Sequence, residues 1–393
     1  MMKISVTGLG KAGLPLSAVI ADAGLEVIGI DIDKKRVEMI NEGKNPLPEE
    51  PGLSQLIEKH GGKSFTATCE GVKAIKNTDF HIVVVPLFLD KHNKPDFSIL
   101  EAAFVTVGKG LKKNDIVILE TTVPVGTTDT FVRKILEKES KLKGGEDFFL
   151  SYSPERIMTG YSISRYKEFP KVIGGINKIS GEKTLEVYKR FCSNPTLVSN
   201  AKTAEMIKIS EGAYRDVNIA LANELFKMCK YYGIDFNEMR TNANHKYCNI
   251  HKAGIGVGGH CIPVYPWFLI NDFEEIGKSD FVKLIKTGRF VNDAMVDFWV
   301  DIIAKKVKKL DKPINEVKVC IKGISYRPGV KEVAYSRSIA LIKKLEGLDV
   351  QVFAWDELYS KEEIEKMGLK YSDLDGCDIV FDVFACIDSE ILI

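Results

Sequence analysis

The sequence of 393 residues lacks a long apolar run, a dominant charge and any pairing pattern among its cysteines. No stretch of about 18 apolar residues occurs, and the N-terminus lacks the layout of a signal peptide, so we expect no membrane span and no export. The formal net charge is only +1, which argues against nucleic acid or an acidic membrane as a partner. The eight cysteines form no Cys-x-x-Cys pair and no cluster at zinc spacing. We therefore expect free thiols, no metal and a cytoplasmic location.

Glycine and proline are concentrated in one segment, residues 254–266, which surrounds Cys261. Four glycines occupy residues 254–259, and Pro263 and Pro266 follow the cysteine. Glycines permit unusual backbone conformations and prolines stiffen the chain, so the segment is predicted to be a shaped loop. A thiol in such a loop is a candidate nucleophile. The same pattern suits a buried structural cysteine in a tight turn, and the loop alone does not decide between the two.

Short apolar segments alternate with helical patterns in the first part of the chain. Residues 3–7, 27–31, 82–85 and 116–119 are predicted as buried strands. Strands that are apolar throughout and separated by helices are typical of a parallel sheet covered on both faces. The fold class is therefore α/β, with a doubly wound, Rossmann-like N-terminal domain.

The pattern changes near residue 199. Apolar residues recur at helical spacing from 201 to 232, and Gly233 stands where a C-terminal cap would. Such a helix spans roughly 45 Å, which is long enough to join two domains or to build a dimer interface. A second long helix is predicted over residues 281–308.

Alternation resumes after residue 311, with strands predicted at 317–321, 350–356 and 379–384 and a helix at 338–345. This indicates a second, smaller Rossmann-like domain. The expected division is 1–198, 199–310 and 311–393.

A glycine-rich turn directly follows the first predicted strand. Gly8, Gly10 and Gly13 have the spacing Gly-x-Gly-x-x-Gly between that strand and the next helix. This spacing allows a tight turn, close approach of a pyrophosphate and close helix–strand packing. Asp31 ends the second strand, where a carboxylate can bond ribose hydroxyls and would repel a 2′-phosphate. The combination predicts NAD, with its phosphates at the N-terminus of the first helix.

Further motifs accompany this turn and the cysteine loop, at residues 122–126, 153–156, 204–208, 214–220 and 323–328. With these motifs in this order, the chain resembles the UDP-glucose/GDP-mannose (nucleotide-sugar) dehydrogenase family over nearly its whole length. The resemblance implies two α/β domains joined by a long helix, usually assembled as a dimer on that helix. The histidine directly before Cys261, His260, resembles the pattern of the branch that acts on 2-acetamido sugars such as UDP-N-acetylmannosamine.

The resemblance also implies a reaction, a four-electron oxidation of the C6 alcohol of a UDP-sugar to the carboxylate with two NAD. Cys261 would attack the C6 aldehyde to form a thiohemiacetal and then a thioester, which water hydrolyses. Lys208 would stabilise charge on the C6 oxygen, and Glu155 and Thr122 would position or activate the water. A UDP-N-acetylhexosamine, UDP-N-acetylmannosamine above all, is the expected substrate. UDP-glucose is the alternative, as is a two-electron or inactive member of the family.

The same resemblance assigns binding roles. Residues 1–198 would bind NAD, with Thr122 among the contacts; 199–310 would dimerise and carry catalysis; 311–393 would bind the UDP-sugar. A homodimer or larger homo-oligomer with a role in polysaccharide biosynthesis is expected. The implied substrate contacts are Glu155, Arg156, Lys208, Lys252, Gly256, Gly258, Gly259 and Arg327.

Four positions depart from the family's pattern. Gly212 stands where the family has an asparagine that helps bind the oxyanion, and Tyr265 where it has an aspartate that supports proton transfer. Ala334 replaces an arginine, and Tyr247 stands near the place of an intersubunit arginine. Losing one oxyanion donor typically costs ~3 kcal/mol of transition-state stabilisation. Gly212 would make room either for Tyr265 or for a bulkier substituent.

Overall fold

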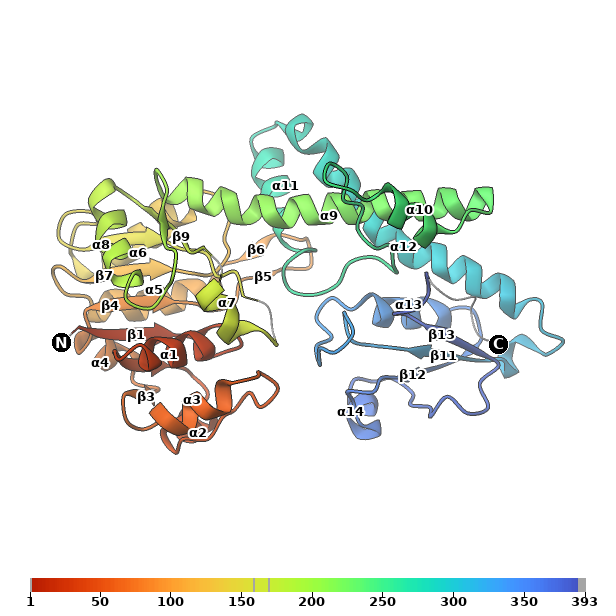
Figure 1. The fold of residues 1–393 in the computed structure, drawn as a ribbon, viewed down its shortest axis with the longest axis horizontal. Coiled ribbons are helices and arrows are strands. Elements are labelled where there is room, and N and C mark those ends of the chain that lie inside the picture. Colours follow the sequence, from red (N-terminus) through yellow and green to blue (C-terminus); the bar gives the residue numbers. More distant parts are fainter. Residues whose placement is uncertain (1, 158–159, 169, 388–393) are drawn as a thin grey trace. The chain divides into compact units, whose positions relative to one another are not determined.

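The computed structural model describes residues 2–157, 160–168 and 170–387 of the chain. It consists of two compact units, Met1–Ser210 and Glu211–Ile393. The boundary between them falls within the long helix α9 (Ala201–Tyr232), which Figure 1 shows in green. Within the described ranges, no helix is both long and apolar enough to cross a membrane.

An eight-stranded sheet forms the centre of the first unit, in the order β10-β9-β8-β7-β4-β1-β2-β3. Every neighbouring pair is parallel except β8 and β9. The chain order reverses between β1 and β4, and ligands of such sheets bind where the strands end at this reversal. The strands are β1 (Lys3–Thr7), β2 (Glu26–Ile30), β3 (Phe65–Thr68), β4 (Phe80–Val83), β7 (Ile116–Leu119), β8 (Phe149–Tyr152), β9 (Val172–Gly175) and β10 (Thr196–Leu197).

Two apolar cores, one on each face of this sheet, hold the first unit together. In β7, Ile116 and Ile118 belong to one core, while Val117 and Leu119 belong to the other. Alternate side chains of a strand point to opposite faces, which is why a doubly covered strand is apolar throughout. A short hairpin, β5 (Phe88–Leu89) and β6 (Pro95–Asp96), lies outside the sheet. The helices are α1 (Gly13–Asp22), α2 (Lys34–Asn41), α3 (Leu53–His60), α4 (Gly71–Lys76), α5 (Ser98–Gly110), α6 (Arg133–Ser140), α7 (Ser162–Glu168) and α8 (Lys178–Tyr188).

The second unit combines long helices with a small parallel sheet, ordered β12-β11-β13. Phe226 of α9, Trp299 of α12 and Phe381 of β13 share one core; the Trp299 ring lies 5.6 Å from that of Phe226 and 5.1 Å from that of Phe381. These contacts tie the two long helices to the sheet. The elements are α10 (Phe236–Ala243), α11 (Tyr265–Glu275), α12 (Lys283–Val307), β11 (Lys318–Lys322), α13 (Arg337–Glu346), β12 (Gln351–Trp355), α14 (Lys361–Lys366) and β13 (Ile379–Asp382).

The predicted α/β fold with two sheets and a long central helix is confirmed, and the first sheet is parallel except where β9 runs antiparallel to β8. Strands 3–7 and 116–119 and the helix 201–232 have the predicted bounds. The helix predicted over 281–308 is wrong at its start, because a separate 3-10 turn (Ser279–Val282) precedes α12.

Candidate active site

The glycine-rich turn has the shape of a phosphate cradle. Gly8 has a φ of +93°, and a Cβ there would lie 2.6 Å from the Val84 carbonyl oxygen, so only glycine fits. At Gly10, apart from its chain neighbours, no heavy atom of the described residues lies within 4 Å of the Cβ position, which leaves open space beside the start of α1. No side-chain hydrogen bond caps this helix at Ala12. Open space next to an uncapped helix N-terminus suits a pyrophosphate, so these residues fit a dinucleotide.

Asp31 also holds the turn in shape. Its carboxylate accepts hydrogen bonds from the backbone N–H of Leu9 at 2.8 Å and of Asp33 at 2.9 Å. Arg36 lies 3.1 Å from the same side chain. Asp31 is therefore fixed at the carboxyl end of β2, the position from which it is predicted to contact a ribose.

Glu155 lies just beyond β8, with its Oε1 atom buried and, among the described residues, without a hydrogen-bond partner. Burial raises the pKa of its carboxyl group to about 7, which the positive charges of Lys208 and Lys171 oppose and the Glu120 charge reinforces. Lys208, half-buried on α9, is thus close to Glu155 within the first unit. A carboxyl group that titrates near neutral pH is suited to general-base catalysis.

A buried ion pair that was not predicted from the sequence lies near Glu155. The Lys171 ammonium lies 2.8 Å from Glu120, and both residues are at most 6% exposed. The Tyr188 hydroxyl donates a further hydrogen bond to Glu120. The only signal in the sequence is a glutamate directly after an apolar strand, since its partners come from distant segments.

Glu205 is a second residue whose role the sequence did not predict. This fully buried α9 residue accepts hydrogen bonds from the Gly126 N–H at 2.5 Å and from the Thr128 N–H and hydroxyl at 2.9 and 2.6 Å. It fastens the turn that follows Thr122 to the helix that carries Lys208. Burial raises the pKa of Glu205 to about 7.

The Cys261 side chain is exposed, so the interpretation as a buried structural cysteine is wrong. Its loop is held from several sides within the second unit. Gly256 has a φ of +107°, and a Cβ there would lie 2.5 Å from the Asn292 carbonyl oxygen. The Gly259 N–H donates to the Ala334 carbonyl at 2.8 Å. His260 Nε2 lies 3.4 Å from a carboxylate oxygen of Glu332, a partner outside the loop.

Gly212 and Tyr265, two of the departures from the family's pattern, are in contact. A Cβ on Gly212 would lie 2.5 Å from Cδ2 of the Tyr265 ring and 3.0 Å from the Tyr265 Cβ. The Tyr265 N–H in turn donates to the Cys261 carbonyl at 3.0 Å. The absent side chain at 212 thus makes room for the aromatic ring, one of the two interpretations left open by the sequence.

The other predicted substrate contacts lie in both units. In the first, Arg156 donates to the Pro170 carbonyl at 3.0 Å. In the second, the Arg327 guanidinium lies 5.7 Å from the centre of the Tyr326 ring, and Lys252 is exposed. The predicted substrate roles stay predictions. The first unit carries Gly8, Gly10, Gly13, Asp31, Thr122, Glu155, Arg156 and Lys208, and the second carries Lys252, Gly256, Gly258, Gly259, Cys261 and Arg327.

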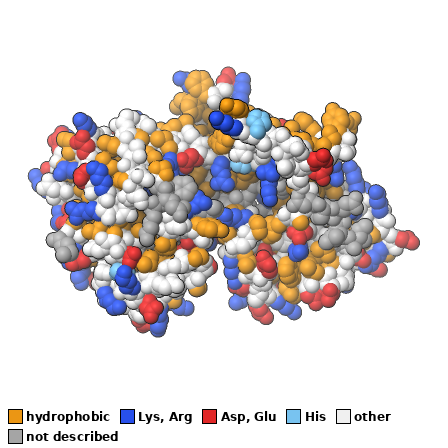
Figure 2. Space-filling view, viewed as in Figure 1, with side chains coloured by type: hydrophobic (Ala, Val, Ile, Leu, Met, Phe, Trp, Pro, Cys, Tyr) orange, Lys and Arg blue, Asp and Glu red, His pale blue; other side chains and the backbone are white. Residues whose placement is uncertain are grey.

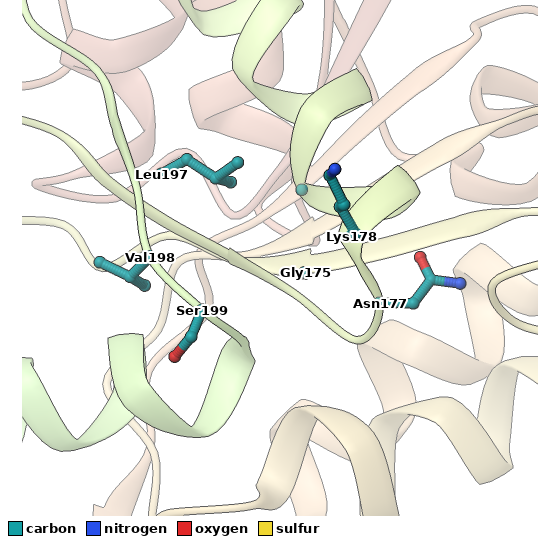
Figure 3. A pocket seen from close by; sticks show the side chains of 7 residues that line it. Gly175, Asn177, Lys178, Leu197, Val198 and Ser199 are labelled. Carbon is teal, nitrogen blue, oxygen red and sulfur yellow. The ribbon is translucent and has the colours of Figure 1, made fainter.

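A separate hollow of about 380 Å³ lies where β9, α8 and β10 meet, as Figure 3 shows. It is lined by Gly175, Asn177, Lys178 and Ser199 among others. The Asn177 side chain already accepts the Ser180 N–H at the start of α8, at 2.8 Å. The hollow contains none of the predicted site residues, and we assign it no function.

The doubly wound sheet, the cradle at its reversal point and the carboxylate at Asp31 define a dinucleotide-binding protein. Residues 2–192 match the NAD binding domain of the UDP-glucose/GDP-mannose dehydrogenase family, and residues 202–294 match its central domain. The chain belongs to this family, as the sequence motifs indicated, and NAD is its cofactor.

Known proteins similar to this chain include three whose names refer to N-acetyl sugars. A UDP-N-acetyl-D-mannosamine dehydrogenase of Campylobacter jejuni is 35% identical over 87% of this chain and 83% of that protein. An NDP-N-acetyl-D-galactosaminuronic acid dehydrogenase of Ralstonia nicotianae is 34% identical over 87% of this chain and 79% of that protein. The solved structure of a UDP-D-ManNAc dehydrogenase from Pyrococcus horikoshii has a TM-score of 0.90 at 30% identity, covering 98% of this chain and 89% of that one.

Proposed function

We propose that this enzyme oxidises the C6 alcohol of a UDP-N-acetylhexosamine, UDP-N-acetylmannosamine above all, to the carboxylate. The names of the similar proteins support the substrate class. The observation that carries the mechanism is the exposed Cys261 thiol on a loop of restrained backbone. A nucleophile must reach its substrate, and a held loop supplies it in one geometry.

In the proposed reaction, the glycine-rich turn and Asp31 would hold NAD, which would supply the hydride acceptor for each of two oxidations. The first gives the C6 aldehyde, and the Cys261 sulfur adds to its carbon to form a thiohemiacetal. Loss of the second hydride leaves a thioester, and attack by water releases the carboxylate and the thiol. One alcohol, two NAD⁺ and one water thus give one carboxylate, two NADH and three protons.

Three residues of the first unit serve this chemistry in our proposal. Lys208 supplies a positive charge for the C6 oxygen as negative charge develops on it. Glu155, with a pKa of about 7, takes a proton from the attacking water. Thr122 lies between β7 and the turn that Glu205 anchors, and it orients the water and contacts NAD.

The test is a panel of UDP-sugars followed by NADH release and by product mass. Wild type should give two NADH per UDP-N-acetylmannosamine and a product heavier by one oxygen and lighter by two hydrogens. Cys261→Ala should form no carboxylate, whereas Cys69→Ala, which removes an exposed thiol of the first unit, should match wild type. One NADH per sugar, or full carboxylate formation by Cys261→Ala, would contradict the thioester route; activity on UDP-glucose alone would contradict the substrate.

We also propose a homodimer built on α9. Tyr214, Leu221 and Met228 recur every seven residues along this helix and are about half exposed, at 57%, 48% and 53%. Figure 2 shows apolar side chains along the edge where α9 to α11 lie in Figure 1. An apolar stripe of this kind is typical of an interface. Light scattering should give a dimer mass for wild type and for the exposed control Lys230→Glu, and a monomer mass for Leu221→Glu.

A cytoplasmic location is part of the proposal. All eight cysteines lie in the described part of the chain, and none forms a disulfide. Proteins with many reduced thiols are typical of a reducing compartment. Fractionation of the native host, with the enzyme followed by immunoblot, tests this directly.

A further inference from the structure

A buried polar network lies between α9 and α12 in the second unit. Asp216, Asn223, Arg289 and Asn292 are each at most 1% exposed. Arg289 Nη1 lies 2.5 Å from Asp216 Oδ1, and the Asn292 amide donates to the same oxygen at 2.8 Å. The Asn223 amide donates to the Asn292 side chain at 2.9 Å. Within the described residues, Asp216 Oδ2 and Arg289 Nε have no hydrogen-bond partner, while the other bonds hold these side chains in a defined arrangement.

Two arms of the network reach the cysteine loop. Near its start, the Gly254 N–H donates to the Asn223 side chain at 2.9 Å. Near its middle, Arg337 Nε donates to the Val257 carbonyl at 2.8 Å. Both bonds are to the loop backbone, so they fix its path whatever the side chains do.

Arg337, at the start of α13, is the residue that joins the second arm to the network. Its Nη2 pairs with Asp293 Oδ1, the oxygen that Arg289 Nη2 approaches to 2.5 Å. One guanidinium therefore binds an aspartate of α12 and a loop carbonyl together. A lysine lacks this fixed fork of separate nitrogen donors, because its three N–H groups share one nitrogen at the end of a flexible stem.

We propose that Arg337 is a positioning residue that holds the Cys261 loop in its reactive conformation. The carbonyl that it binds lies between Gly256 and Gly258, where the backbone is least restricted by its own side chains. Releasing that carbonyl frees the segment that carries the nucleophile, and a misplacement of 1 Å can cost about a hundredfold in rate. The proposal rests on Cys261 being the nucleophile of the proposed function.

The experiment compares three variants of the full chain. Arg337→Met keeps the apolar stem and removes both polar contacts, whereas Arg337→Lys keeps a charge for Asp293. Lys344→Met is the matched control, because it breaks another ion pair between α13 and α12, with Asp297, away from the loop. For each variant, one measures kcat, the KM for NAD, the thermal midpoint and hydrogen–deuterium exchange over residues 254–261.

Arg337→Met should lower kcat by about ten- to a hundredfold and speed exchange in the loop, with the KM for NAD unchanged. Compared with Arg337→Met, Arg337→Lys should bring the thermal midpoint back to that of wild type. It should not bring back the wild-type kcat or the slow hydrogen–deuterium exchange of the loop. A full recovery of kcat in Arg337→Lys, or loop exchange in Arg337→Met equal to that of Lys344→Met, would overturn the proposal. If Cys261→Ala keeps full turnover, the proposed function fails, yet the exchange data still decide whether Arg337 holds the loop.

Discussion

From the contact between Gly212 and Tyr265 we predict how much a single methyl group added at residue 212 changes the stability of the protein. In Gly212→Ala the new Cβ would lie 2.5 Å from the Tyr265 ring, closer than real Cβ contacts allow. Overpacking of this kind typically costs ~1–3 kcal/mol, while alanine in a helix interior gains about 1 kcal/mol over glycine. With an overpacking cost of about 2 kcal/mol, the net loss is about 1 kcal/mol.

Removing the Tyr265 ring should reverse the effect of Gly212→Ala on the free energy of unfolding. In a Tyr265→Ala background the ring is gone and only the Cβ of residue 265, 3.0 Å away, must shift slightly, so Gly212→Ala should stabilise the protein by up to about 1 kcal/mol through helix propensity. The expected coupling energy between the two positions is thus about 2 kcal/mol. Urea unfolding of wild type, both single variants and the double variant measures it, and thermal midpoints should differ by roughly 2–4 °C per step.

Measuring kcat for the same four proteins tests whether the contact between Gly212 and Tyr265 matters for function. The Tyr265 N–H bonds the Cys261 carbonyl, so displacing Tyr265 also displaces the residue that carries the thiol. Gly212→Ala should therefore lower kcat more than its stability loss explains. Additive stabilities, or a Gly212→Ala variant more stable than wild type, would refute the reasoning, since the ring would then not occupy the space above Gly212.

Three further predictions concern the first unit. Because the pKa of Glu155 in the free protein is about 7 and the carboxylate is the active form, kcat/KM should rise as pH increases through 7, and the rise should vanish in Glu155→Gln. Asp31→Asn should raise the KM for NAD at least tenfold, while Asp33→Asn, at an exposed position, should leave it within twofold; equal effects would contradict the ribose contact. Glu205→Ala orphans three buried donors at about 1 kcal/mol or more each, so it should cost ~3 kcal/mol in urea unfolding, with Met206→Ala near wild type as the control.

Elements whose signal is local were predictable. The strand at 116–119 is apolar at each position because both faces of the sheet are covered, and that pattern is visible in the sequence alone. The glycine turn after β1 was equally clear, because its three glycines stand within six residues between a strand and a helix, although the Val84 carbonyl that excludes a side chain at Gly8 comes from a distant segment. The 3-10 turn before α12 was missed, since residues 279–282 continue the helical pattern without a strong breaker.

The groups that support the site were not predictable. Glu205 bonds a turn about 80 residues earlier in the chain, and Glu120 pairs with Lys171 across a gap of about 50 residues in the first unit. Such pairs have no spacing rule, because the distance between two residues along the chain says nothing about which buried charge finds which partner.

The sequence by itself determined the α/β fold, the cofactor and the family, because these depend on periodicity and on motifs whose residues are neighbours. The tertiary structure decided what the departures mean. In the folded chain the Tyr265 ring fills the space left by Gly212, and the Cys261 thiol is accessible to solvent. Arg337 donates a hydrogen bond to the backbone of the cysteine loop. Each depends on which surfaces meet when the helices pack, and packing is a property of the folded chain rather than of any one segment.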